Sequence, residues 1–557
     1  MARFRRFGGN AHAGPHRAGS GAVIAIFCLG LFMTLLDLTI VNIAIPQVVD
    51  HLHASLEEVL WVLNAYSLLY AVLLITSGRL GDIFGPRNVF AVGLVVFTAA
   101  SAGSGFAHSP AQLIAFRALQ GFGAALMSPQ GIPLITAVVP EQKRGGAFAA
   151  IGAMSGLAVL SGPILGGLLV THVGWRWIFF INLPVGAVTL ALTLAFMPDV
   201  RPGRHHRLDL SGVVLATAGL FGVVFGLIEG EHYHWGTVAG FLTIPEIIAA
   251  GVVVLLAFLW RQARLQKSEP LLPFAVFKDR NFTLMALVLA AMGFAMVGIF
   301  LPLTIYYQSV LNLTALAAGL TIAPQAFAMM VSSSTAGALS QKIHGKLMLV
   351  PGLVLFAAGT GYLAWAVQAD AGRWSLLPGL IISGLGIGCV WIPVFSIATS
   401  TMRPDLAGVS SGVLSTVQEL GAVVATAAVG AVLQNRLAIG LHNRAVHDAA
   451  RLPQAYREQF IAGFDRAGRA GLQVGAGQAG GSVPHGLPAG ITRQLRTLGA
   501  DVFGHGFVSA MRPTLLLPLG VIVIAAIACL WIRTMQPQAE PPESPPDRVD
   551  HAEIVAS

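Results

Sequence analysis

The feature that most constrains this chain is a series of long apolar segments between residues 21 and 534. A membrane-spanning helix needs about 20 mostly apolar residues, whereas strands of a membrane barrel have about 10 and alternate in polarity. We therefore expect an all-α polytopic membrane protein with fourteen transmembrane helices. The fourteen segments are 21–45, 57–77, 88–107, 110–137, 146–170, 177–197, 210–229, 238–260, 282–307, 315–339, 347–367, 375–400, 407–434 and 514–534.

The composition excludes a soluble globular protein. Apolar residues make up 55 % of the chain, charged residues 10 %, and the mean hydropathy is +0.74. Soluble domains carry about 25 % charged residues, so most of this chain cannot face water. The three cysteines, Cys28, Cys389 and Cys529, fall inside predicted helices without metal-ligand spacing, and we expect them to serve in packing.

The basic residues indicate how the helices are oriented. If the N-terminus is cytoplasmic, 21 of the 33 Lys and Arg residues lie on the inner side, and the short outer loops hold only Arg176 and Arg373. Nine more lie in 435–513, and long translocated loops escape the positive-inside rule. We therefore expect an integral protein of the cytoplasmic (plasma) membrane with both termini inside. The net charge of +8 then reflects topology, because a nucleic-acid site would cluster its charges on one soluble face.

A weak internal repeat suggests how the helices are grouped. GRLGDIFGPRNVF at 78–90 resembles GALSQKIHGKLML at 337–349, as expected of two related six-helix bundles. Helices 1–6 and 9–14 would form the bundles, with helices 7 and 8 as an inserted pair. The expected parts are a cytoplasmic tail at 1–20, an N-terminal bundle at 21–197, a linker and inserted helices at 198–260, an interfacial segment with a short amphipathic helix at 261–281, a C-terminal bundle at 282–534 with a long extracellular loop at 435–513, and a disordered cytoplasmic tail at 535–557. Within the long loop, we expect a helical first part and a flexible, Gly-rich 468–490.

Two charged residues lie at matching depth inside predicted helices. Asp37, in LLDLTIVNIAIP at 35–46, is 8 residues from the outer end of helix 1, and Arg117, in LIAFRALQGFGAA at 113–125, is about 8 residues from that of helix 4. This corresponds to about 12 Å for each. A charge within the bilayer is costly and usually functional, and pairing lowers its cost. We predict a functional Asp37–Arg117 contact, the alternative being a pair that serves packing alone.

Two glycine-rich motifs predict close helix contacts. The loop GRLGDIFGPR after helix 2 lets backbones approach closely, and Asp82 either pairs with Arg87 or accepts hydrogen bonds from a neighbouring helix end. In GLAVLSGPILGG at 156–167, proline bends helix 5 and glycine admits a second helix. A plain tight turn and a packing motif are the respective alternatives. The residues concerned are Gly78, Gly81, Asp82, Gly85 and Arg87, and Gly162, Pro163, Gly166 and Gly167.

Further candidates lie in the second half and in helix 2. Glu419 is near the midplane of helix 13, where it either binds cationic substrate or protons or is a polar residue satisfied by Gln418 or a serine. For Glu229 and Glu246, in the inserted pair, we expect structural roles. Methionine and aromatic side chains suit promiscuous apolar sites, although in membrane helices they more often face lipid or neighbours. The candidate substrate contacts are Trp61, Asn64, Tyr66, Tyr70, Met292, Met296, Phe300 and Tyr307.

At these motifs the sequence resembles the 14-helix drug:proton antiporters of the major facilitator superfamily, over residues 30–430. WRWIFFINLPVG at 175–186 is similar to the 14-helix branch in particular. The resemblance implies the major facilitator fold, proton coupling by Asp37 and Arg117, and conformational switching by the two glycine motifs. It also implies exchange of substrate for protons. The sequence departs from the family at Asn88, where a second basic residue is common.

The expected function is therefore proton-coupled export of small amphipathic or drug-like molecules by alternating access. We expect the partners to be substrate, protons and membrane lipid, with no nucleotide, nucleic acid, metal or other cofactor, and a monomeric protein. There is no GxxxxGK[ST] phosphate loop and no nucleophile–base cluster, so an enzyme is not expected. The alternatives are an exporter of an endogenous solute, such as a lipid precursor, siderophore or self-made antibiotic, and a non-transporting membrane receptor. Drug-susceptibility assays separate the first from a drug exporter.

Overall fold

The computed structural model describes residues 19–532 except 55, 141–142, 200–208, 231–232, 234, 241, 267–269, 340–342, 400–405 and 471–488. The predicted N-terminal and C-terminal tails, much of the linker at 198–209 and the Gly-rich part of the long loop thus lie outside the described residues. The elements are α1 (Ser20–Leu52), α2 (Leu56–Phe84), α3 (Pro86–Gly105), α4 (Pro110–Met127), η1 (Ser128–Gln130), α5 (Gly131–Val138), α6 (Arg144–His172), α7 (Trp177–Phe180), α8 (Asn182–Phe196), α9 (Leu210–Glu229), β1 (Thr237–Ala239), β2 (Leu242–Thr243), α10 (Ile244–Arg264), α11 (Ala275–Lys278), α12 (Arg280–Ile305), η3 (Tyr306–Val310), α13 (Ala315–Leu339), α14 (Gly345–Ala366), α15 (Leu377–Thr399), α16 (Ala407–Ala449), α17 (Gln454–Ala470) and α18 (Ala489–Cys529).

The helical membrane architecture agrees with the sequence. Among the described residues, thirteen helices are long and apolar enough to cross a membrane. The remaining predicted segment, 110–137, is also helical, as α4, η1 and α5. Its first part carries two buried polar side chains, Arg117 and Gln120, which lower its hydropathy.

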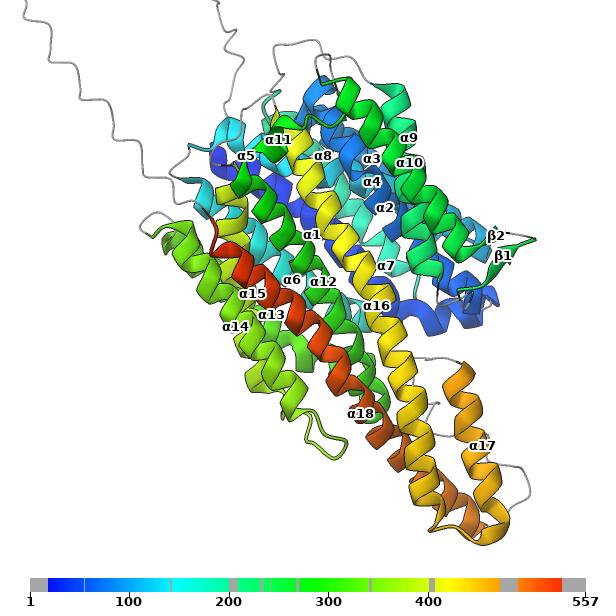
Figure 1. Cartoon of the computed structure of the whole chain (residues 1–557). Coiled ribbons are helices and arrows are strands. Elements are labelled where there is room, and N and C mark those ends of the chain that lie inside the picture. The colour runs from blue at the N-terminus through cyan, green and yellow to red at the C-terminus, as the bar shows by residue number, and fades with distance from the viewer. Residues whose placement is uncertain are drawn as a thin grey trace, which may run out of the picture.

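Two helix bundles meet along two seams. The N-terminal bundle comprises α1 to α8, and the C-terminal bundle comprises α12 to α16 and α18. Helix α2 packs on α16 at one seam, and α6 packs on α13 at the other. We call the end of the bundles where α1 begins and α18 ends the tail end, and the opposite end the extension end (Figure 1).

The inserted pair, α9 and α10, lies against the first seam. The two helices pack on each other, and α9 also contacts both α2 and α16. A short antiparallel hairpin, with Thr237 opposite Thr243, joins them. Asp209 caps the start of α9 and forms an ion pair with Arg261 of α10 at 2.7 Å. Burial raises the pKa of the Asp209 carboxyl, but the Arg261 guanidinium and the Gly212 N–H outweigh it and hold that pKa at about 2.

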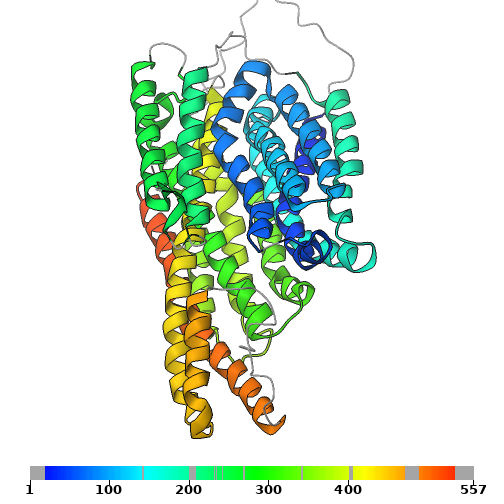
Figure 2. The same cartoon turned by 90° about the vertical axis from the view of Figure 1, so that its right-hand side faces the viewer.

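A helical extension projects from the bundles in both views (Figures 1 and 2). It consists of residues 435–449 of α16, all of α17, and residues 489–512 of α18. The extension buries Leu441, Phe460, Phe464, Leu498 and Phe503 in the same apolar cluster as the core of the C-terminal bundle. The predicted helical character of the first part of the long loop is therefore present, and α18 begins 25 residues before the predicted 514.

The segment at 261–281 differs from the expected amphipathic helix. Helix α10 continues to Arg264, and α11 is a single turn of four residues. Leu271, Leu272 and Val276 are buried in the core of the C-terminal bundle. Leu271, Leu272 and Val276 thus pack inside the protein, whereas Phe277 is 38 % exposed, and the four-residue α11 is too short to form an amphipathic face.

Candidate functional site

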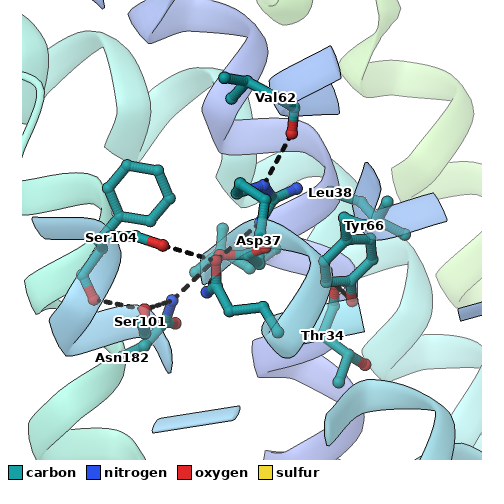
Figure 3. A network of polar contacts seen from close by, with 12 residues as sticks. Thr34, Asp37, Leu38, Val62, Tyr66, Ser101, Ser104 and Asn182 are labelled. Carbon is teal, nitrogen blue, oxygen red and sulfur yellow. Dashed lines mark hydrogen bonds and ion pairs between the residues drawn. The ribbon is translucent and has the colours of Figure 1, made fainter. Parts of the chain in front are cut away.

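An ion pair between Asp37 and Arg117 lies inside the N-terminal bundle. Asp37 projects from the middle of α1 and Arg117 from α4, as their matching depths predicted. Both side chains are essentially inaccessible, with 0 % and 1 % exposure. The Arg117 Nη1 donates to Asp37 Oδ2, and its Nε donates to the carbonyl oxygen of Val62 in α2 at 3.1 Å. The pair thus joins α1, α2 and α4 (Figure 3).

Two uncharged amides complete the shell around the carboxyl group. The other oxygen, Asp37 Oδ1, accepts from Gln120 Nε2 at 3.1 Å and from Asn182 Nδ2 at 3.2 Å. Gln120 lies one turn after Arg117 on α4, and Asn182 begins α8. Both side chains are buried. The carboxyl group therefore receives three donors from three different side chains.

The orientation of these amides follows from their other partners. Gln120 Oε1 accepts from Arg117 Nη1 at 3.0 Å and from Ser104 Oγ at 3.2 Å, so its NH2 group must face Asp37. Asn182 Nδ2 also donates to Ser101 Oγ at 3.0 Å. Every hydrogen bond at the carboxyl group thus points towards it. This pattern suits an ionised carboxylate, which only accepts hydrogen bonds.

The surrounding helices leave this carboxylate no path to solvent. The Tyr66 ring lies 4.5 Å from the Arg117 guanidinium carbon, and its hydroxyl donates to the Thr34 carbonyl at 3.2 Å. On the other side, α6 packs on α1 next to the site. A Cβ atom at Gly162 would collide with Thr39, and one at Gly166 would lie 3.0 Å from Ile40. The second glycine motif therefore permits the close α1–α6 contact beside Asp37.

The first glycine motif forms a contact between the bundles. Asp82, near the end of α2, accepts hydrogen bonds from the backbone N–H of Gly408 at 2.9 Å and of Val409 at 3.0 Å. These groups are at the N-terminus of α16, where unpaired N–H groups and the helix dipole favour an anion. A side chain at Gly78 would collide with the Gly408 carbonyl oxygen. Of the two partners predicted for Asp82, the structure has the helix end.

The rest of this loop acts within the N-terminal bundle. Arg87 Nη2 donates to the Leu194 carbonyl near the end of α8 at 2.6 Å, so Arg87 is not the partner of Asp82. Asn88, where the family commonly has a basic residue, donates to the Phe84 carbonyl at 3.0 Å and caps α2. Gly85 has φ +86°, a conformation that favours glycine, at the junction of α2 and α3. A Cβ at Gly81 would collide with Gln130.

Comparison with a family profile and with a solved structure identifies the family and the fold of this chain. The profile described as Major Facilitator Superfamily matches residues 27–426. The chain belongs to this superfamily. Its fold is shared with the human organic anion transporter MFSD10, at a TM-score of 0.54 and 13 % identity, over 91 % of this chain and 100 % of that one. This major facilitator protein is thus a transporter and not an enzyme.

Its relatives include antibiotic exporters. An uncharacterized transporter of the superfamily from Mycobacterium tuberculosis is 38 % identical over 79 % of this chain and 76 % of its own. The tetracenomycin C resistance and export protein of Streptomyces glaucescens is 33 % identical over 93 % and 92 %, respectively. The puromycin resistance protein of Streptomyces alboniger is 33 % identical over 79 % and 86 %.

In this major facilitator protein, Glu419 lies on α16 at the seam with α2. Its carboxyl is within electrostatic range of the phenols of Tyr66 and Tyr70 on α2. The two tyrosine rings stack with centroids 6.1 Å apart, and Tyr70 donates to Ser128 Oγ at 2.9 Å. A short aromatic path therefore runs from Arg117, through Tyr66 and Tyr70, towards Glu419 on the other bundle. The structure brings these predicted residues together.

Two other predicted substrate contacts face the inserted pair. The Trp61 ring packs on Phe225 of α9, with centroids 5.8 Å apart. Asn64 Nδ2 donates to Glu229 Oε1 of α9 at 3.0 Å, and Glu229 is 2 % exposed. Both α2 side chains thus have protein partners on α9. Glu246, by contrast, caps the start of α10 through Thr243, in the structural role expected.

The helix 9 candidates are dispersed. Met292 is buried in the core of the C-terminal bundle, and Tyr307, in η3, packs on Tyr306. Met296 is half-buried, whereas Phe300 is 42 % exposed. We do not include these four in the proposed substrate site. Gly167 has ordinary contacts with Leu316 of α13, and the side chain of Pro163 lies outside the described residues.

Sequence reasoning missed Gln120 and Asn182 as part of the site. Gln120 follows Arg117 by one helical turn, which was the available signal, and Asn182 sits inside the WRWIFFINLPVG motif. Among the described residues, no three His, Cys, Asp or Glu side chains could hold a metal ion. Cys28 and Cys529 are buried and Cys389 is half-buried, and all three are free thiols.

Proposed function

We propose that this transporter is a proton-coupled antiporter that exports small amphipathic or drug-like molecules by alternating access. The observation that carries the proposal is the Asp37 network, in which a carboxyl group with no solvent path accepts three hydrogen bonds. A proton reaches this group only after the helices around it move. Proton binding is therefore linked to conformation, as antiport requires.

Orientation in the membrane is part of the proposal. The uneven distribution of Lys and Arg supports a cytoplasmic tail end, with both termini inside, and an extracellular extension. Because the Asp82 contact holds the bundles together at the tail end, the described conformation is then closed to the cytoplasm. In this conformation, Asp37 has released its proton or awaits one from outside.

A reconstitution experiment tests the coupling. Purified protein in liposomes with an acidic lumen is expected to accumulate a fluorescent amphipathic dye while protons leave, and an ionophore that dissipates the pH gradient should stop it. Protein-free liposomes control for passive trapping of the dye. Accumulation that is unchanged without the gradient, or that follows a sodium gradient instead, would contradict proton coupling.

We further propose that Glu419 attracts cationic substrates. Its position between the bundles, within electrostatic range of the Tyr70 phenol, combines a carboxyl group with aromatic side chains, and the two together suit an organic cation. We expect Glu419→Gln to lower the apparent affinity for a cationic dye about tenfold, the effect of losing one charge-assisted contact, and to leave a neutral substrate unaffected. Gln418→Asn, at the neighbouring position, is the matched control. Equal losses for cationic and neutral substrates would rule out a charge-specific role.

Export of a self-made antibiotic is a second candidate. The relatives named for tetracenomycin C export and for puromycin resistance support it, because the first aligns with 93 % of this chain. Comparing extracellular metabolites of a deletion strain and its parent, alongside drug susceptibility, separates a dedicated exporter from a multidrug one.

A further inference from the structure

An open cavity lies at the base of the extension. It has a volume of about 650 Å³ and lies between the loop after α14, α16 and α18. Its lining includes basic and hydrogen-bonding side chains, namely Asn443, Arg444 and His447 from α16 and His505, Ser509 and Arg512 from α18, and one carboxylate, Asp370, from the loop after α14.

Of the acidic groups at this cavity, Asp370 belongs to its lining and Asp448 lies beside it. Asp448 is fully buried and pairs with Arg444 at 2.8 Å. Asp370, whose side chain is 86 % exposed, lies 3.7 Å from His505. The Arg512 Nη2 donates to the Val367 carbonyl at 2.9 Å, and no carboxylate among the described residues lies within ion-pair distance of this guanidinium. The other N–H groups of Arg512 are therefore available to a bound group.

An apolar groove adjoins the cavity and shares Arg512 with it. The groove has a volume of about 430 Å³ and lies between α14 and α18. Small residues, Gly361 and Ala364, form part of its lining, while Trp365 and Leu516, also in the lining, are 74 % and 56 % exposed. Arg512 thus lines both the apolar groove and the cavity.

The depth of Arg512 matches a membrane surface. At the tail end, Lys346 donates to the Leu530 carbonyl after the end of α18. From 512 to 530 the helix rises about 27 Å, close to the roughly 30 Å of a bilayer hydrocarbon core. Trp365, at the end of α14 beside Arg512, occupies the position of an interfacial aromatic anchor. The groove therefore lies at acyl-chain depth and the cavity at headgroup depth.

We propose that this composite site binds one anionic phospholipid of the leaflet at the extension end. One acyl chain occupies the groove between Gly361 and Leu516. The phosphate accepts hydrogen bonds from Arg512, and the rest of the headgroup fills the cavity next to Asn443 and His447. Bound there, the lipid joins α14 to α18 and to the base of the extension.

Lipid titration of the purified full-length protein, followed by native mass spectrometry, tests this site. Both lipids carry the phosphate, but the choline cation of phosphatidylcholine is repelled by Arg512 and the neighbouring Arg444, so we expect phosphatidylglycerol to bind about tenfold more tightly. Arg512→Gln should remove this preference, and Arg512→Lys should retain most of it. Arg496→Gln, an exposed arginine on the same helix in the extension, is the matched control and should bind like the wild type.

A second variant tests the groove. A Cβ at Gly361 would meet only Leu519, at 3.9 Å, so Gly361→Leu fits the fold and fills the groove. It should weaken both lipids at this site. Inorganic phosphate at millimolar concentration should not displace the lipid, because it lacks the acyl chain. Equal affinity for the two lipids, an unchanged preference in Arg512→Gln, or displacement by phosphate alone would each overturn the proposal.

Discussion

Replacing Asp37 with asparagine should abolish gradient-driven export while leaving the substrate able to bind. Asparagine still accepts a hydrogen bond from Arg117 but cannot bind and release a proton. The variant should therefore fail to accumulate dye in liposomes with an acidic lumen. Dye binding, followed by fluorescence without a gradient, should persist because Glu419 and Tyr70 are unchanged. A well-folded Asp37→Asn protein that still responds fully to the gradient would contradict the assignment.

The same substitution should cost stability, and a double variant separates the two effects. Removing one partner of a buried ion pair costs about 3–5 kcal/mol, because the other charge stays buried without compensation. Replacing both charges with neutral groups of similar size is often neutral or stabilising. Asp37→Asn combined with Arg117→Met should thus regain thermal stability but remain uncoupled. If the double variant regained gradient-driven export, the proton site would lie elsewhere.

Asp82→Asn should shift the protein away from the conformation described. The carboxylate accepts two backbone hydrogen bonds at the start of α16, whereas an asparagine side chain offers one oxygen and turns an NH2 group towards the second N–H. Losing one such charge-assisted bond costs about 1.5–3 kcal/mol, or roughly ten- to a hundredfold in population. Because the contact joins the two bundles, the cost falls only on the state closed at the tail end.

Distances between spin labels measure this shift. Labels at Phe84 of α2 and Leu347 of α14, both exposed, report the separation of the bundles at the tail end. We expect longer distances to gain population in Asp82→Asn. Arg87→Gln is the matched control, because Arg87 lies in the same motif but bonds only to Leu194 within its own bundle. Equal shifts in both variants would assign the effect to general loosening of the loop.

The features that could be predicted from the sequence are those for which the alternative arrangement has a large free-energy cost. Burying Asp37 or Arg117 alone within a bilayer is so costly that matched depth was enough to pair them. The transmembrane segments were predictable for the same reason, because exposing about 20 consecutive apolar residues to water is equally unfavourable and lipid solvates them instead. For Asp82 the sequence left two partners open, because a carboxylate pairs with an arginine or with a helix N-terminus at similar cost. Only the packing of α2 on α16 decides between them.

Other features depend on how helices are rotated against each other. Asn182 and Gln120 are uncharged, so burying them costs less free energy than burying a charge. Buried amides occur in many structural contexts, and the sequence alone does not single these two out. Trp61 and Asn64 lie on the face of α2 that contacts the inserted pair, which no periodicity in α2 alone indicates. The first half of α18 follows a Gly-rich segment and is too polar to read as a span, so its helix was not expected.

The continuity of α16 has a mechanical consequence. This helix has 43 residues without an internal proline, and at 1.5 Å per residue it extends for about 65 Å. Its first turn receives the Asp82 contact, and its last turns form the extension. A helix of this length behaves as a lever arm, so that a 10° rotation about its first turn moves its far tip by about 11 Å. Opening or closing of the bundles at the tail end would therefore shift the position of the extension at the opposite end of the molecule.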